Sequence, residues 1–348
     1  MQQPKVTSWT LFHTWNKSID LGREDRLIQP RDYIYASELG QSMIDRYLKM
    51  TGVAPTNPPN ARSKRKFEAG NLWEWVIKSI LLRAGILIAD QKQCNFQYPG
   101  LLSVHGRLDF IAGGKPDYEK AQEEINKMML PEVTMRAARE IVADLQKNYP
   151  NGLKEIVLEF KSKGSMLYDR IEATGKAEPH HLLQAFHYLK SEDATEAHVV
   201  YLCRDDCRMT EIGVYNPSDV ELAYKQDIEQ MTYYIKNKVQ PPKEDLMVFS
   251  EDTFKFSKNW KVEYSNYLEM LYGYKDPMEY YEEYSRKAAQ WNRVFKRCVD
   301  GAKMTALNLE VIADIRLYYP DFDDLVEKAR VAGAELLEEE IEATQGGD

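Results

Sequence analysis

The chain has 348 residues, of which 43% are hydrophobic and 29% are charged, and its mean hydropathy is -0.56. A chain of this length can bury one large core or two smaller ones, as soluble globular proteins do. It contains no apolar run long enough to cross a membrane, and its first residues lack the basic start and apolar block of a secretory signal. The composition therefore argues against an integral membrane protein, and we expect a cytoplasmic protein that does not bind membranes.

The formal net charge of -9 is concentrated at one end of the chain. Residues 321–348 contain ten acidic and two basic residues, a net of -8, so the rest of the chain carries only -1. A local basic groove for an anionic partner is therefore compatible with the composition. We interpret the acidic end as a solvated helix with a frayed terminus; a tail that binds a partner or mimics DNA is the alternative.

Four cysteines are present, at positions 94, 203, 207 and 298. Only Cys203 and Cys207 are close in sequence, and no pair has the spacing of a zinc site. The pattern favours free thiols in a reducing compartment.

Residues 1–66 are expected to form an N-terminal segment that ends in a basic loop. A helix within residues 31–52 would start at Ser37 as its N-cap and stop at Gly52. The Pro- and Asn-rich loop after it ends in a basic cluster of Arg62, Lys64, Arg65 and Lys66. A helix over residues 67–84 follows, with an apolar stripe at helical spacing that consists of Trp73, Val76, Ile77, Ile80 and Ala84.

Residues 67–216 are expected to form an α/β domain. Strands are predicted at 86–98 and 101–113, on either side of a Pro-Gly turn, and at 156–161. A polar, helix-prone insertion at about 115–150 separates the second strand from the third. A helix at 179–190 then precedes a hairpin of strands at 197–203 and 208–215. Residues 217–348 are predicted to be mostly helical, with one helix starting at Asp276 and Pro277.

The strongest candidate for chemistry is the segment Leu-Glu-Phe-Lys at 158–161, which contains the chain's only Glu-x-Lys. On a strand, Glu159 and Lys161 project from the same face. A salt bridge on an edge strand is the simpler interpretation, but a strand this apolar is expected to be internal. A buried carboxylate and ammonium need a reason to be there, and a metal ion with a substrate phosphate would provide one.

A second candidate is Asp109, in the segment Gly-Arg-Leu-Asp-Phe at 106–110. Alternation predicts that Leu108 and Phe110 lie on one face of the strand and Asp109 on the other. Taken alone, Asp109 is best explained as a surface residue of a hairpin. Together with Glu159 it could hold a hard divalent cation such as Mg²⁺, which proteins bind through one or two carboxylates plus substrate phosphate.

Two helices supply further candidates. Glu74 lies on the shoulder of the apolar stripe of helix 67–84, and Gly70 clears space one turn earlier. A shoulder carboxylate is usually solvated or paired, but here it could add a metal ligand. On helix 179–190, Gln184 and Tyr188 are neighbours on the face opposite the expected buried stripe of Leu182, Phe186 and Leu189.

In chain order these features read G-x-x-x-E at 70–74, G-R-L-D at 106–109, E-x-K at 159–161 and Q-x-x-x-Y at 184–188. This order resembles the PD-(D/E)XK nuclease superfamily, in particular the RecB-type exonucleases, which include phage recombination exonucleases and CRISPR adaptation exonucleases. The resemblance covers about residues 67–215. It implies a restriction-endonuclease-like core of a helix, three antiparallel strands, a helix and a strand.

The resemblance also implies residue roles in a DNA exonuclease or endonuclease that uses Mg²⁺ or Mn²⁺. Asp109 and Glu159 would bind the metal with the backbone carbonyl of Phe160, and Glu74 would be a further ligand. Lys161 would orient or activate the attacking water. Gln184 and Tyr188 would organise the site and contact the DNA. The candidate contacts to the DNA backbone are Lys64, Arg65, Lys66, Lys163, Arg170 and Lys176.

Two departures from the family pattern matter. Relatives often hold an iron–sulfur cluster through four cysteines, but the corresponding stretches of this chain contain none, so we expect no cluster. The insertion between Asp109 and Glu159 lengthens the usual spacing. A role in DNA recombination, repair or phage DNA processing follows by analogy, as do a homo-oligomer and a single-strand annealing protein as partners.

The main alternative is a catalytically silent DNA-binding or assembly protein with the nuclease fold, and a hydrolase of small phosphates is a third hypothesis. The sequence leaves open exonuclease against endonuclease action, strand polarity, and the preference for single- or double-stranded DNA.

Overall fold

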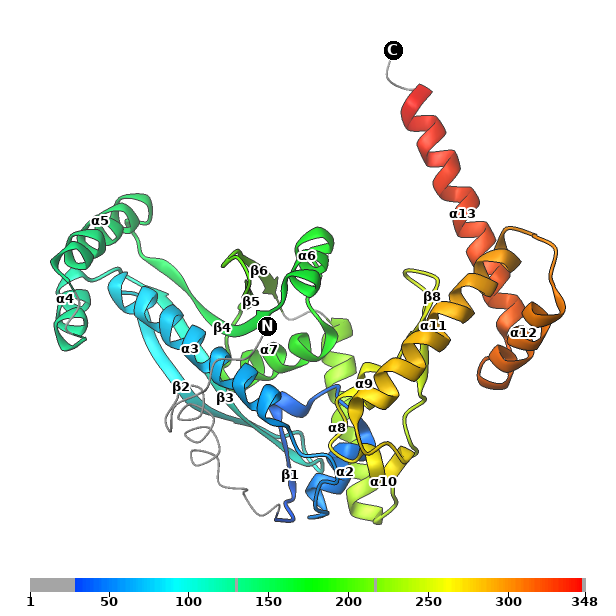
Figure 1. Ribbon diagram of the computed structural model, residues 1–348. Coiled ribbons are helices and arrows are strands. Elements are labelled where there is room, and N and C mark those ends of the chain that lie inside the picture. The colour runs from blue at the N-terminus through cyan, green and yellow to red at the C-terminus, as the bar shows by residue number, and fades with distance from the viewer. Residues whose placement is uncertain (1–28, 129–130, 216–217, 346–348) are drawn as a thin grey trace, which may run out of the picture. The chain divides into compact units, whose positions relative to one another are not determined.

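The computed structural model describes residues 29–128, 131–215 and 218–345, with side chains described up to residue 333. The chain divides into two compact units, Met1–Ala54 with Pro58–Pro241, and Pro55–Asn57 with Pro242–Asp348 (Figure 1). Much of the expected N-terminal segment, the expected boundary at 216–217 and the acidic side chains from Glu335 onward lie outside the described residues.

The first unit is a mixed α/β fold, as the sequence predicts. Its elements are β1 (Tyr33–Tyr35), the 3-10 helix η1 (Ala36–Glu38), α2 (Met43–Met50), α3 (Ala61–Arg83), β2 (Leu87–Phe96), β3 (Ser103–Gly114), α4 (Tyr118–Lys127), α5 (Glu132–Asn148), β4 (Leu153–Lys163), α6 (Ser165–Thr174), α7 (Pro179–Glu192), β5 (Ala197–Cys203), β6 (Met209–Val214) and α8 (Ser218–Asn237). Helices α4 and α5 occupy the expected insertion. Among the described residues, no helix has the length and apolar character needed to span a bilayer.

The sheet of this unit has six strands and is mostly antiparallel. Its order is β1-β3-β4-β5-β6, and β2 pairs with the other edge of β3. Strands β2, β3 and β4 are antiparallel neighbours, whereas β5 runs parallel to β4. On the edge of β3 away from β2, the pairing changes from β1 at residues 103–105 to β4 from Phe110 onward. The strand pairing on this edge is therefore interrupted at residues 106–109.

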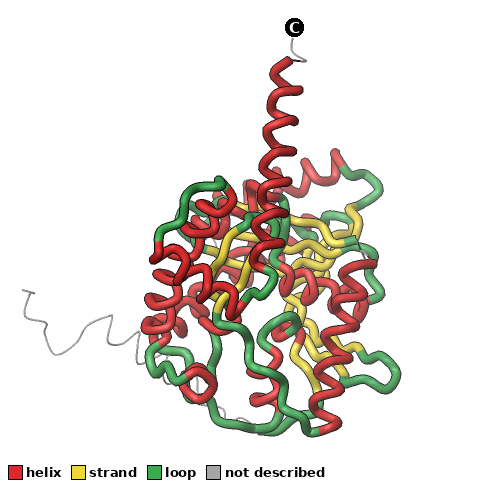
Figure 2. The backbone as a smooth tube through the Cα atoms, turned by 90° about the vertical axis from the view of Figure 1, so that its right-hand side faces the viewer, coloured by secondary structure: helices red, strands yellow, loops and turns green. Residues whose placement is uncertain are grey.

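Helices cover both faces of the sheet (Figure 1, Figure 2). One core contains Leu158 and Phe160 of β4 together with Ile77 of α3. The other contains Val157 of β4 together with Phe186 of α7. The side chains of β4 thus alternate as predicted, and the alternation directs Glu159 and Lys161 toward the α7 side.

The predicted alternation in β3 is wrong. Leu108 belongs to the core beneath α7, whereas Phe110 belongs to the core beneath α3. The paired strand β2 changes face at the same level, because Asp90 forms an ion pair with Lys78 of α3 and Lys92 forms one with Glu192 of α7. Between them, Gln91 has a φ of 49°, in the left-handed region, so the regular two-residue alternation breaks beside Asp109.

Two helix predictions at the N-terminal side also need correction. The basic cluster at 62–66 belongs to the first turns of α3 instead of a loop, because the Asn60 side chain caps the helix by accepting from the Ser63 amide at 2.9 Å. Helix α2 is capped by Ser42, whose Oγ accepts from the Asp45 amide at 3.4 Å, and not by Ser37, which lies in η1. In α3, Ile80 of the expected buried stripe is 41% exposed.

The central part of helix α7 is buried on both its sheet-facing and its outer side, which the sequence pattern did not predict. Its residues from 183 to 189 are all buried, so Gln184 and Tyr188 do not lie on an open face. Tyr188, with Gln184 bonded to it, faces β3 of the sheet, and the other side of the helix is covered by α8, whose Tyr224, Ile228 and Met231 pack into the same core. The first unit therefore continues past the expected boundary at 216 and ends at Pro241.

The second unit consists of a β-hairpin and helices. Its elements are β7 (Met247–Ser250), β8 (Lys255–Lys258), α9 (Trp260–Glu263), α10 (Leu268–Tyr272), α11 (Pro277–Val299), α12 (Ala306–Tyr318) and α13 (Phe322–Gln345). Helix α11 starts where the sequence predicts, with the Asp276 side chain accepting from the Met278 amide at 2.9 Å. Its aromatic core residues include the fully buried Trp291.

Candidate active site

Asp109 lies where the pairing between β3 and β4 stops. Its Oδ2 accepts a hydrogen bond of 2.8 Å from the backbone N–H of Phe160. The carboxylate therefore supplies the acceptor that a neighbouring strand would otherwise provide. Because β2 and β3 change face beside Gln91, Asp109 points into the interruption of strand pairing at residues 106–109, next to β4.

Glu159 and Lys161 form an ion pair on the internal strand β4. Glu159 is only 1% exposed, so the prediction of an internal strand is confirmed. The salt bridge that the sequence allowed does form, but it satisfies one carboxylate oxygen only. The other, Oε2, is buried and has no hydrogen-bond partner. A buried, unpaired carboxylate oxygen is costly unless a ligand completes it.

Glu74 reaches this group from α3. Burial, followed by the negative charge of Asp109, raises the pKa of Glu74 to about 7 against the opposing effect of Lys161. Near it, a Cβ added at Gly70 would meet only the Ser162 hydroxyl, at 3.8 Å, so the helix crosses β4 with space to spare.

The site contains more carboxylates than cationic side chains, and this excess is reflected in the pKa values of its residues. Burial raises the pKa of Asp109 and of Glu159, and the charge of Asp109 adds to the effect on Glu159. Burial alone would lower the pKa of Lys161, but the carboxylates Glu159 and Asp109 outweigh it and raise this pKa. Three carboxyl groups thus share the charge of Lys161, with a smaller contribution from Arg107 to Glu74 and Asp109, and this excess of carboxylates suits an additional cation.

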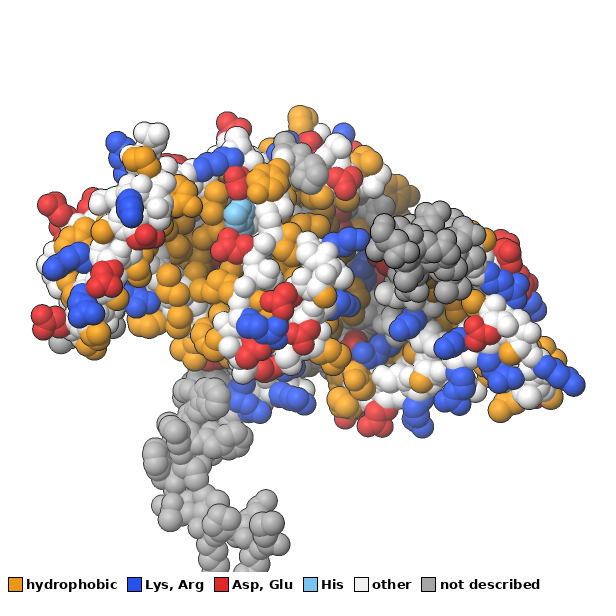
Figure 3. Space-filling view, turned by 90° about the horizontal axis from the view of Figure 1, so that it is seen from above, with side chains coloured by type: hydrophobic (Ala, Val, Ile, Leu, Met, Phe, Trp, Pro, Cys, Tyr) orange, Lys and Arg blue, Asp and Glu red, His pale blue; other side chains and the backbone are white. Residues whose placement is uncertain are grey.

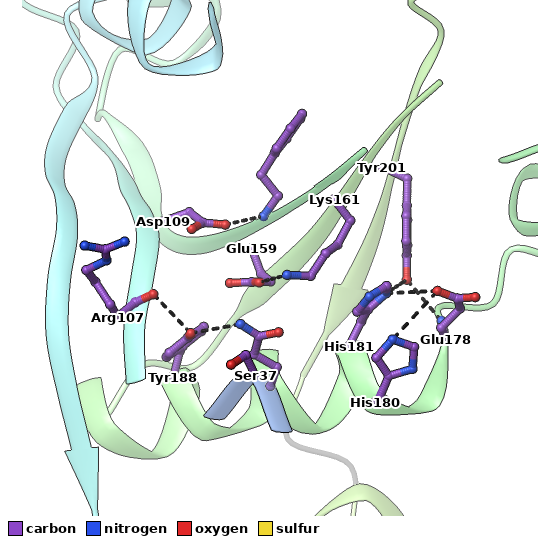
Figure 4. A network of polar contacts seen from close by, with 12 residues as sticks. Ser37, Arg107, Asp109, Glu159, Lys161, Glu178, His180, His181, Tyr188 and Tyr201 are labelled. Carbon is purple, nitrogen blue, oxygen red and sulfur yellow. Dashed lines mark hydrogen bonds and ion pairs between the residues drawn. The ribbon is translucent and has the colours of Figure 1, made fainter. Parts of the chain in front are cut away.

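Gln184 and Tyr188 of α7 connect the site to the open edge of β3. The Gln184 amide donates to the Tyr188 hydroxyl at 3.0 Å, and this hydroxyl donates to the backbone carbonyl of Arg107 at 3.1 Å. Figure 4 shows this chain of contacts beside Glu159, with Ser37 close by. The two side chains therefore satisfy the backbone where β3 lacks a strand partner.

Gly106 makes this approach possible, and its replacement by alanine is expected to disturb the site. An added Cβ would lie 2.7 Å from the Tyr188 ring and 2.9 Å from the Ala36 Cβ. We expect Gly106→Ala to lower the free energy of unfolding by about 1–3 kcal/mol, as overpacking does, and to displace Tyr188. Urea unfolding measures this; Gly70→Ala, with open space around it, is the matched control and should not destabilise. Equal stability of both variants would contradict the expected contact.

The candidate DNA-contacting bases fall into separate groups. Lys64, Arg65 and Lys66 lie in the first turns of α3. Lys163 forms an ion pair with Glu178, and the Arg170 guanidinium lies 3.6 Å from the same carboxylate. Lys176 is exposed and follows α6. Basic and acidic side chains are interspersed on the left-hand side of the face seen in Figure 3.

A polar network around Glu178 was missed by the sequence analysis. The His181 Nδ1 lies 2.8 Å from the Tyr201 hydroxyl, which also accepts from the Glu178 amide at 3.0 Å. Tyr201 is the register partner of Lys161 on the adjacent strand, so the network adjoins the site (Figure 4). The one local signal was the sequence Glu-Pro-His-His at 178–181, at the start of α7.

Comparisons with known proteins were made at three levels. No protein-family model matches the chain, and no curated protein matches it. Among solved structures, SSO0001 is 16% identical with a TM-score of 0.39, over 75% of this chain and 95% of that one. The alkaline exonuclease LHK-Exo from Laribacter hongkongensis is 11% identical with a TM-score of 0.31, over 61% and 94%. LHK-Exo in complex with dAMP has a TM-score of 0.38 at 11% identity, over 62% and 94%. TM-scores this low assign neither a family nor an activity to this chain.

Proposed function

We propose that the chain is a metal-dependent deoxyribonuclease that hydrolyses DNA phosphodiester bonds at Asp109, Glu159 and Lys161. The observation that carries this proposal is the Oε2 atom of Glu159, which is buried without a hydrogen-bond partner near a second, partly buried carboxylate, that of Asp109. DNA as the substrate, and exonuclease action in recombination, repair or phage DNA processing, rest on the resemblance of the four motifs.

The donor set fits a hard divalent cation. Asp109, Glu159 and Glu74 offer carboxylate oxygens, and the resemblance adds the backbone carbonyl of Phe160. Oxygen ligands of this kind suit Mg²⁺ and Mn²⁺. When bound, such an ion would lower the pKa of a coordinated water and offset charge on the phosphoryl oxygens.

Side chains of the protein would position the attacking water and stabilise the reacting phosphate. Lys161, held by Glu159 on the internal strand, would position the attacking water, and its positive charge would offset the negative charge that develops on the phosphoryl oxygens. Gln184 and Tyr188 would fix the geometry of β3 beside Asp109. Because Glu159 and Tyr188 are almost completely buried, packing would hold both side chains in place before substrate binds.

Incubation of the pure protein with end-labelled duplex DNA tests the proposal. We expect hydrolysis with Mg²⁺ or Mn²⁺ and none with EDTA. Salt-dependent DNA binding without turnover in any metal would favour the silent DNA-binding alternative. Hydrolysis of a nucleotide monoester but not of DNA would favour a small-phosphate hydrolase.

Metal binding is expected to depend on pH in a defined direction. The raised pKa of Glu74, about 7, means that the folded protein holds this proton more tightly than the unfolded chain does. In the absence of metal, its contribution therefore lowers the free energy of unfolding as the pH rises from about 5 to 7. Mn²⁺ requires the deprotonated carboxylate, so it should raise the melting temperature more at pH 8 than at pH 6. Thermal unfolding measures both; Glu74→Gln should weaken the pH dependence, and an equal shift at both pH values would contradict it.

A further inference from the structure

Glu178 is surrounded by nitrogen groups from three elements. Its Oε2 forms an ion pair with Lys163 of β4 and lies 3.4 Å from the Nδ1 of His181 and 4.0 Å from the Nε2 of His180. Its Oε1 lies 3.6 Å from the guanidinium of Arg170 on α6. The Glu178 side chain is only 16% exposed, so this carboxylate is a partly buried anion. It lies at the centre of a cluster formed by Lys163, Arg170, His180 and His181.

The cluster is better suited to an anion than to a metal ion. Glu178, His180 and His181 have ligand atoms within 4.8 Å of one another, close enough to share a cation. However, Lys163 and Arg170 already neutralise the carboxylate. The charge of Lys161 also acts on His181 and helps to keep its imidazole neutral by lowering the pKa, after burial as the main cause. A further dication would be repelled by these side chains, whereas a phosphate would replace the carboxylate with the same partners.

The cluster lies next to the proposed catalytic lysine. Lys163 follows Lys161 by two residues on β4, so both project from the same face. Tyr201, opposite Lys161 on β5, bonds to the Glu178 amide and to His181. A nucleic-acid backbone with one phosphate at Lys161 could thus bring another to Lys163.

We propose that Glu178 is an internal counter-ion that occupies a subsite for a phosphate of the nucleic-acid backbone, next to the phosphodiester that is cleaved. This inference rests on the proposed function. Without substrate, Glu178 pairs with Lys163 and Arg170 and stabilises these two cations in the folded protein. With substrate, a backbone phosphate takes these partners and Glu178 turns out to solvent. Glu178 thereby weakens DNA binding and helps to set its salt dependence.

The test compares the affinities of variants for fluorescein-labelled duplex DNA, measured by anisotropy in EDTA so that no hydrolysis occurs. Glu178→Gln is expected to bind DNA about tenfold more tightly, the equivalent of one charge-assisted hydrogen bond. For this variant, the slope of log Kd against the logarithm of the salt concentration should increase by about one, as expected for one additional released counter-ion. Glu196→Gln is the matched control and should bind like the wild type, because Glu196 also pairs with a lysine and a histidine, Lys154 and His198, but at the other end of these strands.

A second substitution tests whether the tighter DNA binding of Glu178→Gln depends on Lys163. Lys163→Met should abolish the tighter binding of Glu178→Gln, because the phosphate would then lose the lysine that Glu178 releases. Unchanged or weaker DNA binding by Glu178→Gln would overturn the proposal. If that variant does not fold, Glu178→Asp, whose shorter side chain cannot hold Lys163 as closely, must bind more tightly than the wild type or the proposal fails. Hydrolysis of DNA by the wild type is measured separately. If the wild type hydrolyses DNA but the Glu178 variants bind it no more tightly, this inference is refuted and the proposed function is not.

Discussion

Replacement of Lys161 by methionine is expected to reduce DNA hydrolysis by about 10²–10³-fold, the range for loss of one group that stabilises developing negative charge. Methionine keeps most of the side-chain volume and removes the ammonium. Glu159, which loses its ion-pair partner, can take up a proton, because burial has already raised its pKa. The variant should therefore remain folded, and the loss should appear in the rate of hydrolysis at saturating DNA and metal.

Lys154→Met is the matched control for this experiment. Lys154 lies on the same strand and forms an ion pair with Glu196, but it is 55% exposed and lies at the other end of β4. Its replacement should leave the rate unchanged. If Lys161→Met hydrolyses DNA at the wild-type rate and only loses stability, then the pair with Glu159 is structural and the proposed mechanism is wrong.

Replacement of Asp227 by alanine is expected to cost about 3–5 kcal/mol of unfolding free energy. Asp227, on α8, accepts two hydrogen bonds from the Arg46 guanidinium of α2, at 2.7 and 2.8 Å. Arg46 is 1% exposed, so its charge would be left buried without a counter-ion. Asp227 also accepts from the Gly40 amide at 3.2 Å, so the loop before α2 would lose a contact as well.

Urea unfolding of the variant measures this cost. The matched control on the same helix is Glu229→Ala, which removes an ion pair with Lys225 whose side chains are 48% and 49% exposed. Exposed pairs of this kind contribute about 0–1 kcal/mol, so the control should unfold like the wild type. A similar small loss for Asp227→Ala would show that Arg46 finds solvent or another partner, and that α2 and α8 are not joined through this ion pair.

The sequence was most informative where local pattern and burial agree. The apolar segment around Glu159 predicted an internal strand, and β4 is internal. The Asp-Pro pair before α11 predicted the start of that helix, because capping depends on neighbours within one turn. The gathering of Asp109, Glu159 and Lys161 was expected from the order of motifs, and the structure brings these three side chains together.

Features that depend on distant contacts could not be read from the sequence. The change of face in β3 arises with the left-handed backbone of Gln91 on the paired strand, and no residue of β3 itself signals it. The burial of the outer side of α7 depends on α8, which comes later in the chain. The role of Glu178 depends on Lys163 and Arg170, which precede it on two different elements and meet it only in the folded protein.

The most direct test of the proposed active site is the anomalous scattering of Mn²⁺ in crystals of the wild-type protein with a short DNA duplex. We predict a Mn²⁺ peak coordinated by the carboxylates of Asp109 and Glu159, with a DNA phosphate bound to the same ion and Lys161 adjacent. A Mn²⁺ ion bound elsewhere, or DNA bound with no metal between it and these two carboxylates, would contradict the proposed nuclease site.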